Sequence, residues 1–137
     1  MTLSKEDRDT IIAYRLQKAH DTFEEVKGII EMKYWHSAAN RLYYACYYAV
    51  TALLIKHNLT THTHAGVINL LGLHFVVKGV ISKEQGKFFK QLFELRQSGD
   101  YSDWFDVGED DILPLLEPAE QFISEIENLI NNGIPHL

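Results

Sequence analysis

Apolar residues follow a helical period in the N-terminal part of the chain. They recur at alternating spacings of four and three, at Ile12, Leu16, Ala19, Phe23, Val26 and Ile30. This spacing places them along one side of an α-helix and leaves the charged residues on the other side. Ser4, followed three positions later by Asp7, has the pattern of a helix N-cap. We therefore predict one long helix from Ser4 to about Met32.

The next segment, from Tyr34 to about His57, is apolar on more than one side. One of its stripes is made mainly of small residues, namely Ala38, Leu42, Ala45, Ala49 and Ala52. A helix that is apolar nearly all round is expected in the middle of a bundle, with neighbours on several sides. Asn58 follows the pattern and is placed to end the helix.

Two further helices are predicted in the second half of the chain. The first covers residues 64–78 and ends at Gly79. The second begins after a capping box that starts at Ser82 and runs to about Gly99.

The C-terminal part of the chain predicts an irregular connector and a last helix. Tyr101–Gly108 is acidic and aromatic without a helical period, whereas Glu109–Asn131 has apolar residues at helical spacing. Pro114 and Pro118 fall in the first turns of this helix, so its true start can lie later. Asn132 and Gly133 follow it as a stop signal.

Length and composition indicate one globular unit. The chain has 137 residues, of which 46% are hydrophobic and 23% charged, and we expect a single domain over residues 1–137. Since no strand pattern or internal repeat is found, the predicted fold is an all-α, up-and-down bundle of four to five helices.

The net charge limits the kinds of partner. It is −6, which argues against nucleic-acid binding through a broad basic surface but leaves room for a local basic site. The longest apolar run, residues 42–55, is too short for a membrane span, and the polar N-terminus does not resemble a secretory signal. We expect a cytoplasmic protein without a membrane partner.

Cysteine and histidine positions argue against a metal centre. Cys46 is the single cysteine and lies in an apolar run, so we expect a buried structural thiol. His57, His62 and His64 are close in sequence, but their spacing does not place three ligands on one helical face. We predict neither a metal nor another cofactor. His36 is expected on a helix surface or in packing.

Polar and aromatic residues form a stripe on the second helix. Ser37, Arg41, Tyr44 and Tyr48 follow spacings of four, three and four. Arg41 is a charge on an otherwise core-like helix, and an unpaired buried guanidinium group would be costly. It therefore needs a carboxylate, a phosphate or an exit to solvent.

The fourth predicted helix contains a similar arginine. Arg96 follows several apolar residues and precedes Asp100 and Tyr101. Two interpretations are open: an internal ion pair of Arg41 or Arg96 with Asp100 that locks the bundle, or an anion site. His64 opens the third helix, where free backbone N–H groups favour an anion.

Three segments resemble a known family. The run from Ala39 to Val50, which reads ANRLYYACYYAV, resembles the second helix of HEPN domains (higher eukaryotes and prokaryotes nucleotide-binding). Thr63–Val67 and Leu95–Tyr101 match two other blocks of the small stand-alone prokaryotic branch, in the same order. The resemblance spans residues 10–130 or so. It implies a five-helix bundle that often forms a homodimer, with a cleft lined by both subunits.

The resemblance also implies a class of activity. Many members act on RNA, and several are toxins paired with a small nucleotidyltransferase. Their catalytic signature is an arginine that stabilises charge on the phosphorane and a following histidine that moves protons, without a metal. The arginine corresponds to Arg96, but the expected histidine positions hold Tyr101, Ser102 and Asp103. His64 could replace the histidine only if the fold brings it beside Arg96.

Three functional interpretations follow. The preferred one is a dimeric HEPN module that binds RNA, nucleotide or a nucleotidyltransferase partner without cutting. The alternatives are a metal-independent ribonuclease toxin, with Arg96 and His64 as catalytic residues, and a purely structural bundle. The candidate ligand-binding residues are Asn40, Arg41, Tyr44, Tyr48, Asp100 and Tyr101.

Overall fold

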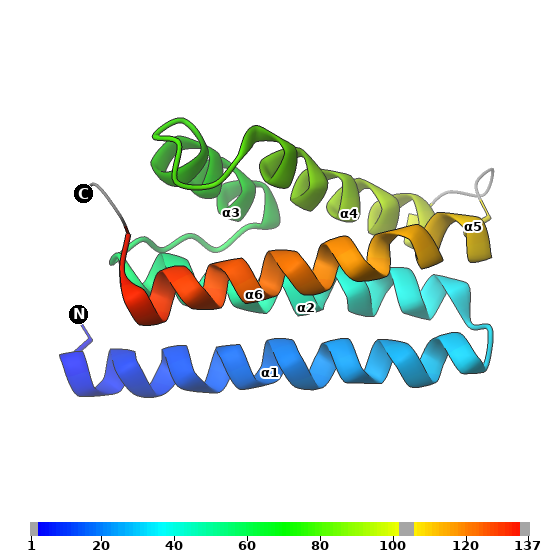
Figure 1. Cartoon of the computed structure of the whole chain (residues 1–137), viewed down its shortest axis with the longest axis horizontal. Helices are drawn as coiled ribbons and strands as arrows, with labels where there is room; N and C mark the ends of the chain where they lie inside the picture. The colour runs from blue at the N-terminus through cyan, green and yellow to red at the C-terminus, as the bar shows by residue number, and fades with distance from the viewer. Residues whose placement is uncertain (1–2, 102–105, 135–137) are drawn as a thin grey trace.

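Helices arranged in layers make up the structure, a computed structural model that describes residues 3–101 and 106–134. In Figure 1, α1 lies along one side, α2 and α6 form the middle, and α3 and α4 cover the opposite side. No strand occurs in the described ranges, so the predicted all-α bundle is confirmed. The helices are α1 (Lys5–Glu31), α2 (Trp35–Lys56), α3 (His64–Leu71), α4 (Lys83–Tyr101), α5 (Glu109–Ile112) and α6 (Leu116–Asn132).

Local signals in the sequence set most helix ends. The Ser4 hydroxyl accepts a hydrogen bond of 3.0 Å from the backbone N–H of Asp7, and the Ser82 hydroxyl accepts one of 3.1 Å from Gln85. Both serines therefore cap their helices as predicted. After α2, Asn58 adopts the left-handed conformation with φ of 59°, which ends the helix where the sequence placed its stop.

The central position predicted for the second helix is confirmed. α2 packs against α1, α3, α4, α5 and α6. The small stripe on α2 is completely buried, and Cys46 is buried as expected. Small side chains let a neighbouring backbone approach closely, which explains how α1 can lie along almost the full length of α2 (Figure 1).

Three aromatic rings connect the middle of the bundle to the covering helix. Phe89 of α4 stacks on Tyr43 of α2 with ring centroids 5.6 Å apart, and on Phe122 of α6 at 5.7 Å. All three side chains are buried to 1% exposure or less. Because the stack joins α2, α4 and α6, it fixes the distance between the middle layer and α4.

Two of the predicted helices are interrupted. The helix predicted over residues 64–78 is α-helical only to Leu71 and continues as a π-helical turn, Gly72–Val76. The backbone N–H of Val77 donates a hydrogen bond of 2.9 Å to the carbonyl of Gly72, five residues earlier. Prediction of one regular helix over 64–78 was wrong here, because apolar residues stand on both sides of Leu71 and do not reveal a change of period.

The last helix was also predicted as one element, and it consists of α5, a 3₁₀ turn (Leu113–Leu115) and α6. The cause is Pro114, which has no backbone N–H and crowds the preceding turn. Helix α4 runs two residues beyond its predicted end, to Tyr101. Among the helices of residues 3–101 and 106–134, none is long and apolar enough to cross a membrane.

We expect Phe89→Ala to lower the free energy of unfolding by about 3–5 kcal/mol, because it removes the central ring of a buried stack. Urea denaturation followed by circular dichroism measures the loss. Phe88→Ala is the matched control. The Phe88 side chain is only half-buried and lies at the edge of the stack, with its ring centroid 6.1 Å from that of Phe122. Equal losses in the two variants would contradict the role assigned to the stack.

Candidate functional site

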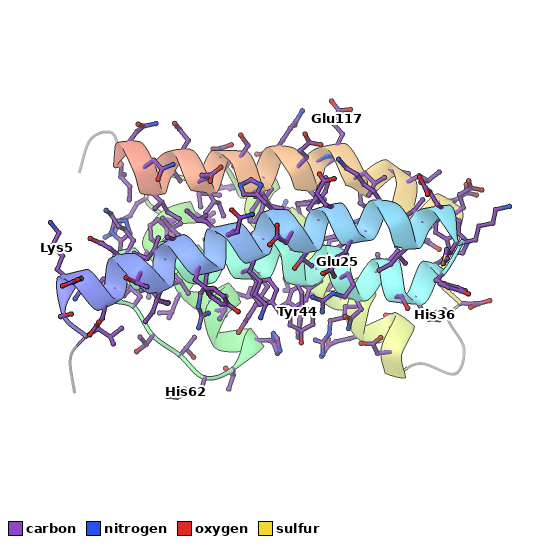
Figure 2. The ribbon with its side chains drawn as sticks, turned by 90° about the horizontal axis from the view of Figure 1, so that it is seen from below. Lys5, Glu25, His36, Tyr44, His62 and Glu117 are labelled. Carbon is purple, nitrogen blue, oxygen red and sulfur yellow. The ribbon has the colours of Figure 1, made fainter. Side chains whose placement is uncertain are left out.

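Side chains from α2, α3 and α4 meet on one side of the bundle. His64 is the first residue of α3, and the Thr63 hydroxyl caps this helix by accepting a hydrogen bond from Gly66 N–H at 2.9 Å. Tyr44 on α2 and His62 in the connector before α3 both point toward the lower edge of the view in Figure 2. We call Arg41, Tyr43, Tyr44, His64 and Arg96 the arginine–tyrosine cluster.

The two tyrosine hydroxyls hold the imidazole ring of His64. A hydrogen bond of 2.8 Å joins the Tyr43 hydroxyl to His64 Nδ1, and the Tyr44 hydroxyl lies 3.5 Å from Nε2. The rings of Tyr47 and Phe93 flank the imidazole, with centroids 4.9 and 5.9 Å away. The histidine is therefore fixed in orientation by groups on two different helices.

Arg96 lies in the same cluster. The central carbon of its guanidinium group is 5.6 Å from the centroid of the Tyr43 ring and 5.4 Å from that of Tyr44, within range of a cation–π interaction. Only 11% of the side chain is exposed. The structure thus brings together Arg96 and His64, the two residues that the sequence proposed as a catalytic pair.

Asp100 is the ion-pair partner of Arg96. Its Oδ2 lies 3.5 Å from Arg96 Nε, and the same oxygen accepts a hydrogen bond of 3.3 Å from Asn40. This contact does not form a hydrogen bond, so Nε is buried without a hydrogen-bond partner among the described residues. The predicted ion pair is present, but it leaves the guanidinium group incompletely satisfied.

Arg41 does not pair with Asp100, which corrects one form of the ion-pair interpretation. Its Nε lies 3.8 Å from a carboxylate oxygen of Glu25 on α1, and 31% of the side chain is exposed. Its guanidinium carbon is 5.6 Å from the ring centroid of Tyr44. Glu25 is available because its position on α1 faces α2, which residue spacing within either helix does not reveal.

Tyr48 and Tyr101 were predicted to bind the ligand but are not part of the arginine–tyrosine cluster. The Tyr48 ring lies beside Tyr44, with centroids 5.9 Å apart, and carries Lys18 of α1 at 4.7 Å from its centroid. It therefore extends the aromatic surface away from Arg96. The side chain of Tyr101 lies outside the described residues, as do Ser102 and Asp103.

The environment of His64 favours its neutral form. Burial and the positive charge of Arg96 lower the pKa of His64 from its usual 6.5. A neutral imidazole has one nitrogen that donates and one that accepts. Burial has the opposite effect on the Tyr43 phenol, whose pKa is raised, so its hydroxyl stays protonated as a hydrogen-bond partner of His64.

Sequence reasoning missed two residues that position the cluster. Tyr43 was assigned only to the large apolar stripe, although a buried tyrosine hydroxyl usually needs a partner. His36, expected on the surface or in packing, forms hydrogen bonds with the carbonyl of Gly99 at 2.9 Å and with Asp106 at 2.8 Å. These bonds hold the end of α4, and they raise the pKa of His36. No sequence signal links His36 to residues so far along the chain.

A metal centre has no support in the described geometry. Within residues 3–101 and 106–134, the His, Cys, Asp and Glu side chains form no group of three or more that could hold a metal ion. The arrangement can instead present two guanidinium groups, a neutral imidazole and aromatic rings to an anionic, partly aromatic ligand.

Comparison with known proteins identifies relatives along nearly the whole chain. A UPF0332 protein of Thermotoga maritima is 35% identical over 126 residues, which cover 92% of this chain and 96% of the relative. The protein named "Putative toxin MJ0605" of Methanocaldococcus jannaschii is 31% identical, with 93% and 94% covered. A UPF0332 protein of Archaeoglobus fulgidus is 27% identical over 119 residues. The family model of the HEPN domain matches residues 12–129, and the chain therefore belongs to the HEPN family.

Proposed function

We propose that this HEPN domain binds single-stranded RNA by its phosphate backbone at the arginine–tyrosine cluster. The observation that carries the proposal is the state of Arg96, whose buried Nε has no hydrogen-bond partner among the described residues. Asp100 is its one ion-pair partner in the part of the chain that the structure describes, and this pair is partly exposed. Because Nε itself is buried, a phosphate oxygen would have to reach this guanidinium group through the 11% of the Arg96 side chain that is exposed, and would accept a charge-assisted hydrogen bond there.

The pairing of two arginines around one ring supports the same conclusion. Arg41 and Arg96 both lie within 5.6 Å of the Tyr44 centroid, so two positive charges share one small surface. Their carboxylate partners, Glu25 and Asp100, contact them at 3.8 and 3.5 Å and are themselves exposed. A ligand with negative charge would relieve the repulsion between the arginines, and exposed partners can turn away from them at little cost.

Aromatic groups beside the arginines favour RNA over a simple anion. Tyr44, Tyr47 and Tyr48 are half-buried and lie in a continuous row along α2, with neighbouring centroids 5.6 to 6.0 Å apart. Unpaired bases stack on such rings, whereas bases in a duplex are not available for stacking. The combination of a local cationic group and aromatic faces therefore matches a single strand.

The family relationship extends the proposal to partners. HEPN membership supports a homodimer, and the toxin names of two Methanocaldococcus jannaschii relatives support a toxin role. The nucleotidyltransferase antitoxin is the partner that the family resemblance implies. In a dimer, a second copy of the cluster would double the number of arginines available to one RNA strand. The proposal therefore includes two partners, a second copy of this chain and a nucleotidyltransferase.

A second candidate function is RNA cleavage, and one observation favours it. The neutral His64 and Arg96 both contact Tyr43 and Tyr44, so a base and a charge-stabilising group border the same space. His64 would take the proton from the 2′-hydroxyl as its oxygen bonds to phosphorus, while Arg96 would stabilise charge on the phosphorane. The P–O5′ bond would then break, giving a 2′,3′-cyclic phosphate, and the leaving 5′-oxygen would take a proton from the His64 imidazolium or from water. Cleavage of total RNA in the presence of a chelator, lost in Arg96→Gln, would make this the better description.

We expect Arg41→Gln and Arg96→Gln each to weaken binding of a single-stranded RNA of about ten nucleotides by about tenfold, because each removes a charge-assisted contact. Fluorescence anisotropy measures the affinity, and circular dichroism verifies the fold. The logarithm of affinity against that of salt concentration should have a slope of about −1 to −3, as expected for two to four neutralised phosphates.

Lys27→Gln is the charge-matched control for the arginine variants. Lys27 lies on α1 and contacts Glu24 and the ring of Phe23 rather than the cluster. It should leave affinity unchanged. If it weakens RNA binding as much as Arg41→Gln, then the attraction comes from the overall charge and the proposed site is wrong.

The pH dependence separates binding from cleavage. The lowered pKa of His64 keeps the imidazole neutral at neutral pH, so it gains a proton beside Arg96 only when the pH is lowered from about 7.5 past that lowered pKa, which lies below 6.5. Phosphate favours the protonated form, and RNA affinity should rise by up to about tenfold over this range. If His64 is instead a catalytic base, the cleavage rate should persist somewhat below pH 6.5 and fall only as the pH drops past the lowered pKa of the imidazole.

His64→Gln is the control for both measurements, because His36, whose pKa is raised, also gains a proton on acidification. The variant should remove most of the pH dependence while leaving the affinity at neutral pH within a few-fold of that of the original chain. A pH profile that is the same with and without His64 would show that the imidazole does not face the bound RNA.

A further inference from the structure

A cavity of about 260 Å³ lies next to the arginine–tyrosine cluster. The connector between α2 and α3 passes along one side of it, and α1 and α2 form the other sides. Its walls include Arg15 of α1, Tyr47 and Leu54 of α2, Thr60 and His62 of the connector, and Val67 of α3. No acidic side chain is among the described residues that line it, whereas the cavities along α6 are lined by glutamates.

Tyr47 connects the cavity to the arginine–tyrosine cluster. Its ring lines the cavity and lies 4.9 Å, centroid to centroid, from the ring of His64. The cavity and the cluster are therefore two parts of one continuous surface. A ligand with its phosphate at Arg96 can extend past His64 and place a neighbouring flat group against Tyr47.

The rim of the cavity offers hydrogen-bonding groups that the fold does not use. The backbone N–H and C=O groups of residues 60–62 form no hydrogen bond with the described part of the chain. The connector is nevertheless held in place, because Thr61 packs so closely on Gly66 that a Cβ atom there would lie 2.0 Å from the Thr61 hydroxyl. Fixed backbone donors and acceptors at an edge suit recognition of one particular base.

We propose that this cavity is a subsite for one unpaired base of the RNA strand whose phosphate is bound at the arginine–tyrosine cluster, and this inference rests on the proposed function. Leu54 and Val67 provide an apolar floor and Tyr47 a stacking face, while Arg15 and His62 reach the rim. The volume is below the roughly 300–1,000 Å³ typical of sites for drug-sized ligands, so it suits one base rather than two.

The test compares ligands that differ only in the base. A nuclear magnetic resonance titration of the isotopically labelled chain uses adenosine, guanosine, cytidine and uridine 5′-monophosphates and, as the ligand without a base, ribose 5-phosphate. At least one mononucleotide should bind about fivefold or more tightly than ribose 5-phosphate, as expected for stacking of one base. The amide signals of Thr61 and His62 should shift only with the mononucleotides.

Thr60→Phe is the blocking variant, because Thr60 lines the cavity from the exposed connector and contributes nothing to the buried core. It should reduce mononucleotide affinity to that of ribose 5-phosphate without changing the affinity for ribose 5-phosphate itself. Ser124→Phe is the control, since it places the same ring on the exposed side of α6, away from the cavity. It should keep the full preference for the mononucleotide.

The outcomes distinguish the subsite from the proposed function. If ribose 5-phosphate binds and Arg96→Gln abolishes this binding, but no mononucleotide binds more tightly, the base subsite is wrong and the phosphate site stands. Retention of the mononucleotide preference in Thr60→Phe overturns the subsite in the same way. If neither the five small ligands nor the ten-nucleotide RNA binds, the proposed function fails and the subsite fails with it.

Discussion

The position of Tyr43 in the middle of α2 is the constraint on which both the core and the candidate site depend. Its ring is fully buried and stacks on Phe89, while its hydroxyl reaches the imidazole of His64 at 2.8 Å. A buried phenol without a hydrogen-bond partner would be costly, so the bundle is most stable when His64 occupies this place. The packing of α4 and the placement of the first residue of α3 are thus determined by one side chain.

Charge is distributed unevenly around this centre. The chain carries a net charge of −6, and Glu117, Glu120 and Glu125 line the outer side of α6. Arg41 and Arg96 are gathered instead at the tyrosines of α2. Positive charge also gathers on α4, where Lys83, Lys87 and Lys90 line a cavity that has no acidic side chain among its described residues. A polyanion would therefore be repelled along α6 and attracted only at such local groups of arginines or lysines. Long-range steering would contribute little to its association, and short-range contacts would decide where it stays.

Much of the fold could be predicted from the sequence because apolar periodicity and capping residues are local properties. The central place of α2 and the ends of α1 and α2 follow from such patterns. The π-helical turn could not be predicted, since the segment after Leu71 is mostly apolar and a change of period within it leaves no trace in the sequence. The nature of the cluster was predicted in part: Arg41, Tyr44, His64 and Arg96 were named, but their partners depend on how the helices face one another.

The contacts of Arg41 and His64 depend on how separate helices are arranged, which local sequence patterns do not describe. Glu25 meets Arg41 because of the rotation of α1 about its axis, and the Tyr43 hydroxyl meets His64 because the connector returns the chain to α2. Both contacts join residues on different elements, so neither helical spacing nor composition contains the information. Only the assembled bundle provides it.

The bonds between His36 and the end of α4 have a consequence for how the chain can vary. His36 holds the carbonyl of Gly99, and near the other end of α4 Gln85 donates a hydrogen bond to Glu125 of α6. Arg96 is therefore carried on a helix anchored at both ends to the rest of the bundle. A change at His36 or at Gln85 would therefore be transmitted along α4 to the guanidinium group, so the chain can vary less at these two positions than side chains near the surface usually allow.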